Sequence, residues 1–325
     1  MAAGAEIVCG VDAWEIATKT YKSNFPDASA ITLKLSNKSG VTDLGKLGSI
    51  DMILASPECT NHTCAKGAAP RNEQSKLTAR YVLRFAKDLK PRWVVVENVV
   101  HMRSWVGYSP LIKGLKRLGY HVRPQVLDAS DFGVPQSRRR LFLLCDLNRE
   151  PSGVPTGRRA PNAHDAVIQW DGPWRSRPLN APKRALGTLE RAERAMAALG
   201  AGTPFLIVYY GSDGSGGWQP LDRPLRTLTT LDRFGLVTWE DDTPMLRMLQ
   251  VPELKRAMGF TPEFELSHGS RRDKVRLMGN GVCPPVMEAL VRSLTGQVSN
   301  ALAVERGATQ NAAAFSLPRV RVVAA

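Results

Sequence analysis

The sequence predicts an α/β protein, because short apolar runs alternate with amphipathic stretches through its first half. Residues 49–56 (SIDMILAS) have the composition of a strand, and residues 74–89 place apolar side chains at helical spacing. Trp93–Val96 follows as a short β-branched run, which is typical of a strand buried on both faces. Strand–helix–strand alternation of this kind favours parallel pairing within one sheet.

Local signals set the ends of these elements. Pro91 ends the helix predicted at 74–89, because proline lacks the backbone N–H that a helix interior needs. A second helix is predicted from Ser109 to Leu118, with Pro110 in its first turn, where a missing N–H costs nothing. Two more strands are expected downstream, at residues 121–127 and 140–145.

The α/β pattern breaks in the middle of the chain. Residues 150–182 are rich in Pro, Gly, Arg and Trp and have no clear periodicity. A helix is predicted at 188–199 and a strand at 205–210, followed by a glycine-rich loop. Helical patterns return after Pro252, and the residues beyond about 299 form an alanine-rich tail that we expect to be loosely held. The middle stretch is therefore predicted to be a second domain or a large insertion.

The composition of the 325-residue chain excludes several classes of protein. With 43% hydrophobic and 23% charged residues, it is neither a disordered acidic protein nor a collagen-like repeat. No apolar run approaches the roughly 18 residues of a membrane span, and the first ten residues lack the layout of a signal peptide. Five cysteines without a C-x-x-C pair argue against a disulfide framework or a zinc site. These features predict a reducing, cytoplasmic location.

The charge balance favours a polyanionic partner. The chain has 44 Lys and Arg against 30 Asp and Glu, which gives a net charge of +14. Nucleic acid is the simplest partner for such an excess, although many basic proteins carry only a solvated basic face.

Two predicted strands end in residues suited to chemistry. Cys59 follows the strand at 49–56, at the edge of a parallel sheet where α/β proteins bind ligands. A cysteine there is either a thiolate nucleophile or a small buried residue without reactivity. Glu97 and Asn98 follow at the end of the next strand. The carboxyl group suits a hydrogen bond to a substrate ring or a proton transfer, whereas Asn98 is equally suited to cap a helix.

Two further segments combine polar side chains with tight turns. Gln136, Arg138 and Arg140 alternate along an extended stretch, so they are predicted to share one face. Two guanidinium groups and an amide suit contacts with an oxyanion, a phosphate or a base, although an exposed basic turn would have the same sequence. Gly279-Asn280-Gly281 suits either a close backbone approach to a ligand or a simple turn between helices.

Taken in this order, the segments resemble the DNA (cytosine-5)-methyltransferase family. The resemblance spans about residues 5–296, and Asp131–Arg138 (DFGVPQSR) is its most specific part. It implies a Rossmann-like, S-adenosylmethionine-dependent methyltransferase sheet with a smaller target-recognition domain. The catalytic domain is expected at 1–147 plus 272–298, the target-recognition domain at 148–271 and the loose tail at 299–325. Supporting stretches are Gly10–Asp12, Asn24–Pro26, Arg223–Thr229 and Met258–Phe264.

The resemblance implies transfer of a methyl group from S-adenosylmethionine to C5 of a cytosine flipped out of DNA, through a covalent adduct at C6. Cys59 would be the nucleophile, and Glu97 would hold N3 and the exocyclic amine. Arg140, with Arg138 nearby, would contact the base carbonyl O2 and order the loop. Cys64 with His62 is an alternative nucleophile pair, although the Pro-x-Cys placement favours Cys59.

The resemblance also assigns binding residues for the cofactor and the substrate. Asp12 would bind the ribose hydroxyls, Asp43 the adenine, and Pro57 and Asn280 the methionine end of S-adenosylmethionine. Candidate substrate contacts, including those to phosphate or guanine, are Asn98, Gln136, Arg158, Arg159, Arg175 and Arg177. The implied partners are double-stranded DNA and a cognate restriction endonuclease, with the chain acting as a monomer.

The sequence departs from the family at its beginning. The family opens with a strand and a Phe-x-Gly-x-Gly-Gly loop, and this sequence has neither. We therefore expect the first strand to be missing and the sheet centre to be unpaired, with an upstream start or a split enzyme as explanations. Two other functions stay open: a tRNA cytosine-5 methyltransferase and a catalytically silent DNA-binding remnant.

Overall fold

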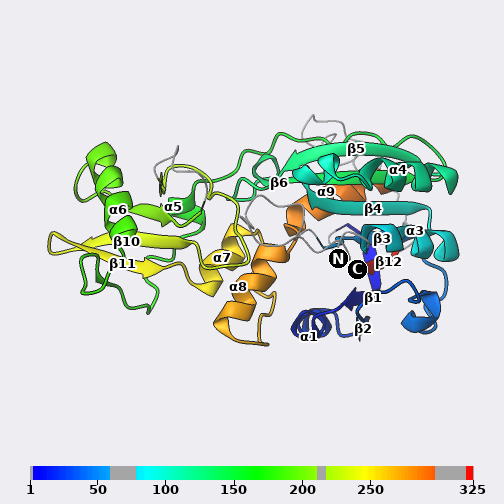
Figure 1. Ribbon diagram of the computed structural model, residues 1–325, viewed down its shortest axis with the longest axis horizontal. Coiled ribbons are helices and arrows are strands. Elements are labelled where there is room, and N and C mark those ends of the chain that lie inside the picture. The colour runs from blue at the N-terminus through cyan, green and yellow to red at the C-terminus, as the bar shows by residue number, and fades with distance from the viewer. Residues whose placement is uncertain (1–2, 59–77, 211–216, 297–319, 325) are drawn as a thin grey trace, which may run out of the picture.

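The computed structural model describes residues 3–58, 78–210, 217–296 and 320–324. Seven strands form its larger sheet: β1 (Ala5–Asp12), β2 (Ser29–Thr32), β3 (Met52–Ala55), β4 (Trp93–Val99), β5 (His121–Asp128), β6 (Arg139–Asp146) and β12 (Val320–Ala324). Their order across the sheet is β2-β1-β12-β3-β4-β6-β5 (Figure 1). The first five strands in this order run parallel, whereas β6 is antiparallel to both β4 and β5.

The centre of the sheet is formed by β12, which lies between β1 and β3. Val320 pairs with Ala5 of β1, and Val322 pairs with Met52 of β3. Val322 is fully buried. The expectation of a loose tail is therefore wrong for residues 320–324, and so is the expectation of an unpaired sheet centre. These β-branched residues bury their side chains and satisfy backbone groups that β1 and β3 would otherwise leave without partners.

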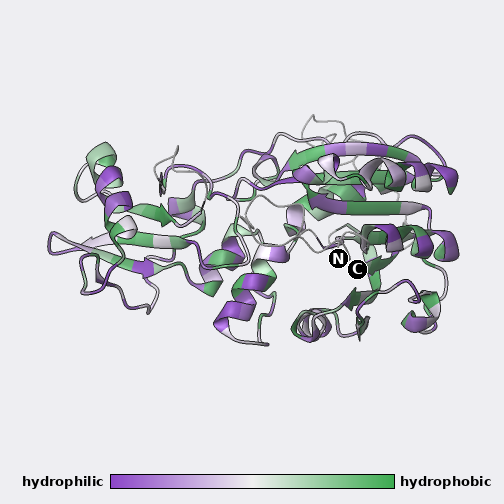
Figure 2. Ribbon diagram, viewed as in Figure 1, coloured by the Kyte–Doolittle hydropathy of each residue, from purple (hydrophilic) through white to green (hydrophobic). Residues whose placement is uncertain are grey.

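Helices cover both faces of this sheet (Figure 1). They are α1 (Glu15–Asn24), α3 (Thr78–Leu89), α4 (Tyr108–Arg117) and α9 (Pro284–Thr295). Val94 of β4 packs in the core with α3 and α4, whereas its neighbour Val95 packs in the core with α9. The apolar run of β4 is thus buried on both faces, as predicted. Figure 2 shows the same distribution, with hydrophobic strands inside and helices of mixed character outside.

A second, five-stranded sheet lies at the other end of the molecule (Figure 1). Its strands are β7 (Arg177–Pro178), β8 (Phe205–Val208), β9 (Trp218–Pro220), β10 (Phe234–Glu240) and β11 (Thr243–Met248), in the antiparallel order β7-β11-β10-β8-β9. The helix α6 (Leu186–Leu199) packs on this sheet through Ala192 and Ala195. All of these elements fall inside residues 148–271.

Short helices occupy the connections and the space between the two sheets. They are η1 (Val41–Leu44), η3 (Val100–Ser104), η4 (Ala129–Asp131), α5 (Ala163–Ala166), α7 (Val251–Ala257) and α8 (Arg271–Asn280). In Figure 1, α7 and α8 lie between the larger and the smaller sheet. Within the described ranges, every helix is too short or too polar to cross a lipid bilayer.

Candidate active site

The carboxylate of Glu97 lies at the carboxyl edge of the larger sheet, between groups from two neighbouring strands. The Ser56 hydroxyl donates a hydrogen bond to Glu97 Oε2, and Arg140 Nε lies 3.2 Å from Glu97 Oε1. Only 6% of Glu97 is exposed, and 16% of the Arg140 side chain is. Because little water reaches this pair, its charges interact more strongly than they would at an open surface. The structure thus brings two predicted catalytic residues, Glu97 and Arg140, together.

Strand register explains why these three side chains meet. Ala55 pairs with Val96 in the parallel β3–β4 ladder, so the next residues along, Ser56 and Glu97, are neighbours. Val99 pairs with Arg140 across the antiparallel β4–β6 ladder, which places Arg140 diagonal to Glu97 on the same face. The site is therefore positioned by rigid sheet rather than by loops.

Asn98 fastens the loop that leads toward Cys59. Its Nδ2 donates a hydrogen bond of 3.0 Å to the carbonyl of Pro57, and its Oδ1 accepts one of 2.9 Å from the Val99 N–H. This side chain, predicted to contact substrate, is thus engaged with the backbone. Cys59 itself lies outside the described residues, as do His62 and Cys64, so their predicted roles stay predictions.

The three cysteines in the described part of the chain are unsuited to act as nucleophiles. Cys9, Cys145 and Cys283 are all buried, and burial raises the pKa of each thiol. The pKa of Cys283 rises to about 11, although the Arg138 and Arg140 guanidinium groups oppose the rise. A thiol with a raised pKa contributes little thiolate at neutral pH. The candidate nucleophiles therefore reduce to Cys59 and Cys64.

Arg138 is directed into the protein and differs in this from Arg140. It is 3% exposed, and its guanidinium donates hydrogen bonds of 2.8–2.9 Å to the carbonyls of Leu228, Gly279 and Gly281. Leu228 belongs to the middle stretch of the chain, and Gly279 and Gly281 follow it, so Arg138 joins the two. The expected contact with the base carbonyl does not fit this placement, whereas the expected ordering of a loop does.

The side-chain amide of Gln136 also forms hydrogen bonds with backbone groups. It is fully buried, and its Nε2 donates to the carbonyl of Ala257 at 3.0 Å while its Oε1 accepts from the Leu228 N–H at 2.9 Å. The expected substrate contact is therefore not supported. Gln136 and Arg138 are both buried and both bind the backbone of Leu228, whereas Ser137 and Arg139 are exposed, so burial alternates along this stretch as the sequence predicts.

Asp128 holds the segment that contains Arg138. Its carboxylate accepts hydrogen bonds from the Ser130 N–H, the Ser137 hydroxyl and the Arg138 N–H. Burial alone would raise the pKa of Asp128, but these hydrogen bonds outweigh it and lower the pKa below the ordinary value of 3.8. Asp128 thus favours its charged form in the folded protein.

Asp128→Asn is expected to lower the free energy of unfolding by about 1–2 kcal/mol at pH 7. A carboxylate with a lowered pKa contributes stability that is present above its unfolded value and is lost as pH falls through the folded value. The difference between variant and wild type should therefore shrink as pH falls toward 3. Urea unfolding at several pH values measures this, with Asp27→Asn at an exposed position as control. A difference independent of pH would contradict the assignment.

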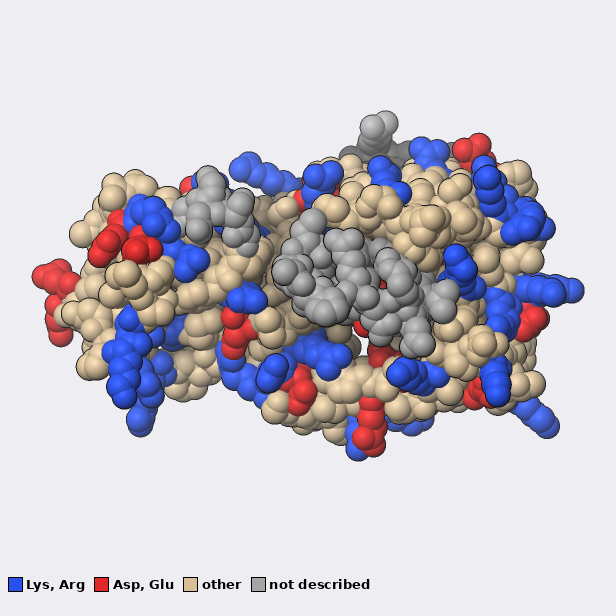
Figure 3. All heavy atoms as spheres, in the orientation of Figure 1, with Lys and Arg blue, Asp and Glu red and all other residues tan. Residues whose placement is uncertain are grey.

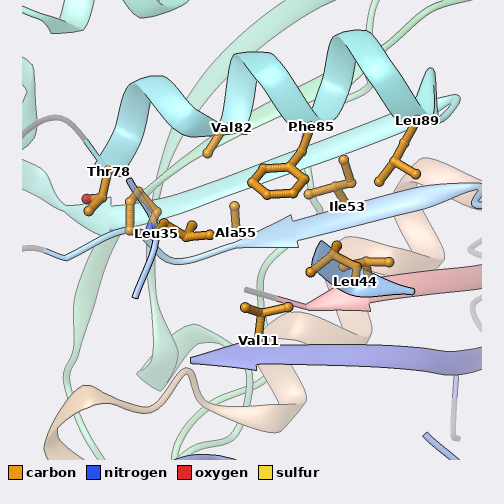
Figure 4. Close-up of a pocket in the computed structure, with 11 residues that line it drawn as sticks. Val11, Leu35, Leu44, Ile53, Ala55, Thr78, Val82, Phe85 and Leu89 are labelled. Atoms are coloured by element: carbon orange, nitrogen blue, oxygen red, sulfur yellow. The ribbon is translucent and has the colours of Figure 1, made fainter. Parts of the chain in front are cut away.

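One apolar pocket has the predicted cofactor residue Pro57 in its lining. It has a volume of about 530 Å³, counted with its opening to solvent, and Val11, Leu44, Pro57 and Val323 are among its lining residues (Figure 4). Val11 and Leu44, which line the pocket, are the chain neighbours of Asp12 and Asp43. Apolar walls of this kind suit a flat ring such as adenine.

Asp12 and Asn280 are brought to the same region by α8. Asp12 Oδ1 accepts a hydrogen bond of 2.7 Å from the Trp14 N–H, and the Arg276 guanidinium lies 4.4 Å from the centre of the Trp14 ring. Asn280 follows Arg276 by one helical turn, on the same face of α8. Partial screening from water raises the pKa of Asp12, and the Trp14 N–H and Arg276 oppose the shift. Asp43, in contrast, accepts a hydrogen bond of 2.9 Å from the Gly40 N–H of its own turn.

Gly279 is required by close packing. A Cβ at this position would lie 2.3 Å from the carbonyl oxygen of Thr229. The Gly-Asn-Gly sequence thus lets α8 approach the backbone of the Thr229 segment, which Arg138 also binds through Leu228. The close approach expected from the sequence is real, and its partner is protein backbone.

The four arginines predicted to contact nucleic acid are exposed and form two groups. Arg158 and Arg159 lie beside the 131–138 segment, where the Arg158 carbonyl accepts a hydrogen bond from Gly133. Arg175 and Arg177 lie at β7, in the part of the molecule that holds the smaller sheet. Figure 3 shows Lys and Arg side chains over both parts of the molecule on the face in view.

Comparison with protein families decides the identity. The model of the C-5 cytosine-specific DNA methylase family matches residues 1–193, which is more than half of the chain. The chain belongs to this family. C-5 cytosine methylases take the methyl group from S-adenosylmethionine. The apolar lining of the pocket, which includes Pro57, suits the flat adenine ring of this cofactor.

Relatives within the family include enzymes named for two kinds of nucleic acid. The type II methyltransferase M.HgiDI of Herpetosiphon aurantiacus is 34% identical over 147 residues, covering 44% of this chain and 46% of that protein. A tRNA (cytosine(38)-C(5))-methyltransferase of Mus musculus is 29% identical over 149 residues, covering 45% of this chain and 35% of that protein. The chain thus spans half or less of the length of these relatives.

A solved structure with a similar fold supports the predicted architecture. The crystal structure of a DNMT2 mutant from Spodoptera frugiperda superposes with a TM-score of 0.64 over 89% of this chain and 92% of that one, at 16% identity. At this identity the likeness concerns the fold. It confirms the α/β, Rossmann-like methyltransferase fold that the sequence predicts.

Sequence reasoning missed two contributors to the site. Ser56, which hydrogen-bonds Glu97, stands directly before the Pro-x-Cys motif, and its position next to Glu97 follows only from the strand register. Val323, which lines the apolar pocket, lies in β12. The run Val320–Val323 is β-branched, and this was the available signal for a strand.

Proposed function

We propose that this chain transfers a methyl group from S-adenosylmethionine to C5 of a cytosine flipped out of duplex DNA. The observation that carries the proposal is the Glu97–Arg140 pair at the carboxyl edge of the sheet, beside the loop that leads to Cys59. A carboxylate and a guanidinium in one sheltered site provide an acceptor and a donor for the polar edge of a pyrimidine.

The chemistry divides one difficult substitution into easier steps. The Cys59 thiolate adds to C6 of cytosine, and the electron pair of the C5–C6 double bond becomes available at C5. Glu97 accepts a hydrogen bond from the exocyclic amine and shares a proton with N3, and Arg140 stabilises charge at O2. The cofactor, when bound, supplies an electrophilic methyl group. Loss of the C5 proton and of the thiolate from C6 then restores the aromatic ring.

The other predicted residues have supporting roles. Asn98 holds the Pro57 carbonyl and so places the loop that carries Cys59. Arg138 and Gln136 bind the backbone of Leu228 and so connect the two parts of the molecule. For the cofactor, Asp12 would hold the ribose, Asp43 and the apolar pocket the adenine, and Pro57 and Asn280 the methionine end.

The division of labour follows the two sheets. Residues 1–147 with 272–298 would form the catalytic domain, and residues 148–271, which contain the five-stranded sheet, would recognise the target sequence. Exposed guanidinium groups at β7 and beside the 131–138 segment suit contacts with phosphate or guanine. Candidates for these contacts are Arg158, Arg159, Arg175 and Arg177. A cognate restriction endonuclease, a monomeric state and a cytoplasmic location remain predictions.

The first test compares nucleic acids as methyl acceptors. Wild-type chain, S-adenosylmethionine with a labelled methyl group and mixed-sequence duplex DNA should yield label in 5-methylcytosine after digestion to nucleosides. Duplex DNA should be labelled at least about tenfold faster than tRNA under the same conditions, because flipping a cytosine from a duplex uses the basic surface of both parts. Label in tRNA alone would contradict the DNA assignment.

The second candidate, a tRNA cytosine-5 methyltransferase, is favoured by the similarity to the Mus musculus tRNA enzyme. It uses the same site chemistry, so the comparison of acceptors separates the two. A catalytically silent DNA-binding remnant is the third candidate. Calorimetric titration with S-adenosylmethionine tests it, since saturable binding together with transfer of label would exclude it.

A further inference from the structure

Among the described residues, the carboxylate of Glu97 contacts two side chains, Arg140 and Ser56. Arg140 contacts Oε1, and the Ser56 hydroxyl donates to Oε2. We propose that Ser56 is a positioning residue, which holds the carboxylate plane of Glu97 in the orientation that a cytosine ring requires. This inference rests on the proposed function and deepens it.

The strand register explains why Ser56 meets Glu97. It is the first residue after β3, and the parallel register Ala55–Val96 sets it beside Glu97. Its loop is held separately, because the Pro57 carbonyl accepts a hydrogen bond from Asn98. A change confined to the Ser56 side chain should therefore leave the loop in place. The hydroxyl has a specific partner rather than a general structural role.

The lone pairs of the carboxylate explain what the hydroxyl achieves. Each carboxylate oxygen accepts from two directions, so Ser56 and Arg140 each use one direction and leave one on each oxygen. One remaining direction can accept from the exocyclic amine, and the other can meet N3 through a proton that the two share, because N3 of neutral cytosine is itself an acceptor. The terminal torsion of a glutamate is broad, so one partner alone fixes it poorly. With Arg140 alone, the carboxylate would turn toward the guanidinium and lose alignment with the substrate.

A matched pair of variants isolates the hydroxyl. Threonine and valine have nearly the same shape, but only threonine retains the donor. Ser56→Val and Ser56→Ala are therefore expected to slow single-turnover methyl transfer to duplex DNA about tenfold. Ser56→Thr is expected to stay within about threefold of wild type. Ser104→Ala, which removes a hydroxyl bonded to the His101 carbonyl, is the control and should not change the rate.

Binding measurements separate positioning from general damage to the site. The affinities for S-adenosylmethionine and for DNA should change less than about twofold in all four variants, so the loss appears in the rate and not in KM. Covalent trapping on DNA that contains 5-fluorocytosine should slow in parallel with methyl transfer. This readout follows addition at C6, the step that the orientation of Glu97 assists.

The possible failures are distinguishable. An active wild type whose Ser56→Ala and Ser56→Val variants match it in rate would overturn the role of Ser56 and leave the proposed function standing. Equal losses in Ser56→Val and Ser56→Thr would also overturn it, because shape and not the hydroxyl would then matter. A wild-type chain that transfers no methyl group to any nucleic acid would overturn the proposed function and this role with it.

Discussion

Cys59→Ala is expected to abolish methyl transfer, with a loss of at least about 10³-fold in single-turnover rate. Covalent catalysis requires a nucleophile, and groups that act as a unit with it cannot replace it. The three described cysteines cannot substitute, because Cys9, Cys145 and Cys283 are buried and burial raises the pKa of each thiol. Transfer of a labelled methyl group to duplex DNA measures the loss.

The matched control is Cys64→Ala, five positions further along the same stretch. It should stay within about twofold of wild type, and both variants should bind DNA as wild type does in an electrophoretic assay. An active Cys59→Ala together with an inactive Cys64→Ala would transfer the nucleophile to Cys64. In that case His62 would become the candidate base beside it.

Val322→Asp is expected to unfold the larger sheet, with a loss of more than about 4 kcal/mol in the free energy of unfolding. Val322 is fully buried in the central strand β12, where it packs in the same core as Val95 and the residues of α9. An aspartate there would place a charge in an apolar core with no partner. Circular dichroism and thermal unfolding measure the effect.

Val106→Asp is the matched control for this substitution. Val106 is 84% exposed, so the same chemical change occurs in water and should shift the midpoint of unfolding by less than about 2 °C. If Val322→Asp were as stable as Val106→Asp, β12 would not be part of the folded sheet. Val322→Ala should give an intermediate loss, because it removes packing without burying a charge.

Much of the larger sheet could be predicted because its signals are local. The helix predicted at 74–89 is present from Thr78 in the described residues, with Ala79, Val82 and Phe85 buried as its spacing requires. The strand at Trp93–Val96 is present and extends to Val99. A strand buried on both faces needs only a continuous apolar run, which the sequence contains. These elements need no knowledge of distant partners.

β12 could not be predicted in the same way. Its sequence gives a short β-branched run, but a run of this length does not identify its neighbours. Its pairing partners, Ala5 and Met52, are far away in sequence. The position of this run between β1 and β3 becomes clear only when the whole sheet is assembled. Local periodicity does not say which strands will be neighbours.

The candidate site was predictable where side chains project from regular strands. Glu97 and Arg140 meet because both belong to ladders with a defined register. Gln136 and Arg138 lie on one buried side of the stretch before β6, but their bonds to Leu228 depend on how the two parts of the molecule pack. Such packing is a tertiary property, and sequence spacing does not encode it.

The position of β12 has a consequence for how the chain acquires its shape during synthesis. Ala5 and Val320 are paired although about 315 positions separate them. Until residue 320 leaves the ribosome, β1 and β3 each present an open edge that other chains can pair with. Such distant pairing makes acquisition of the native state slow. Cellular yield should therefore respond strongly to chaperone supply and to growth temperature.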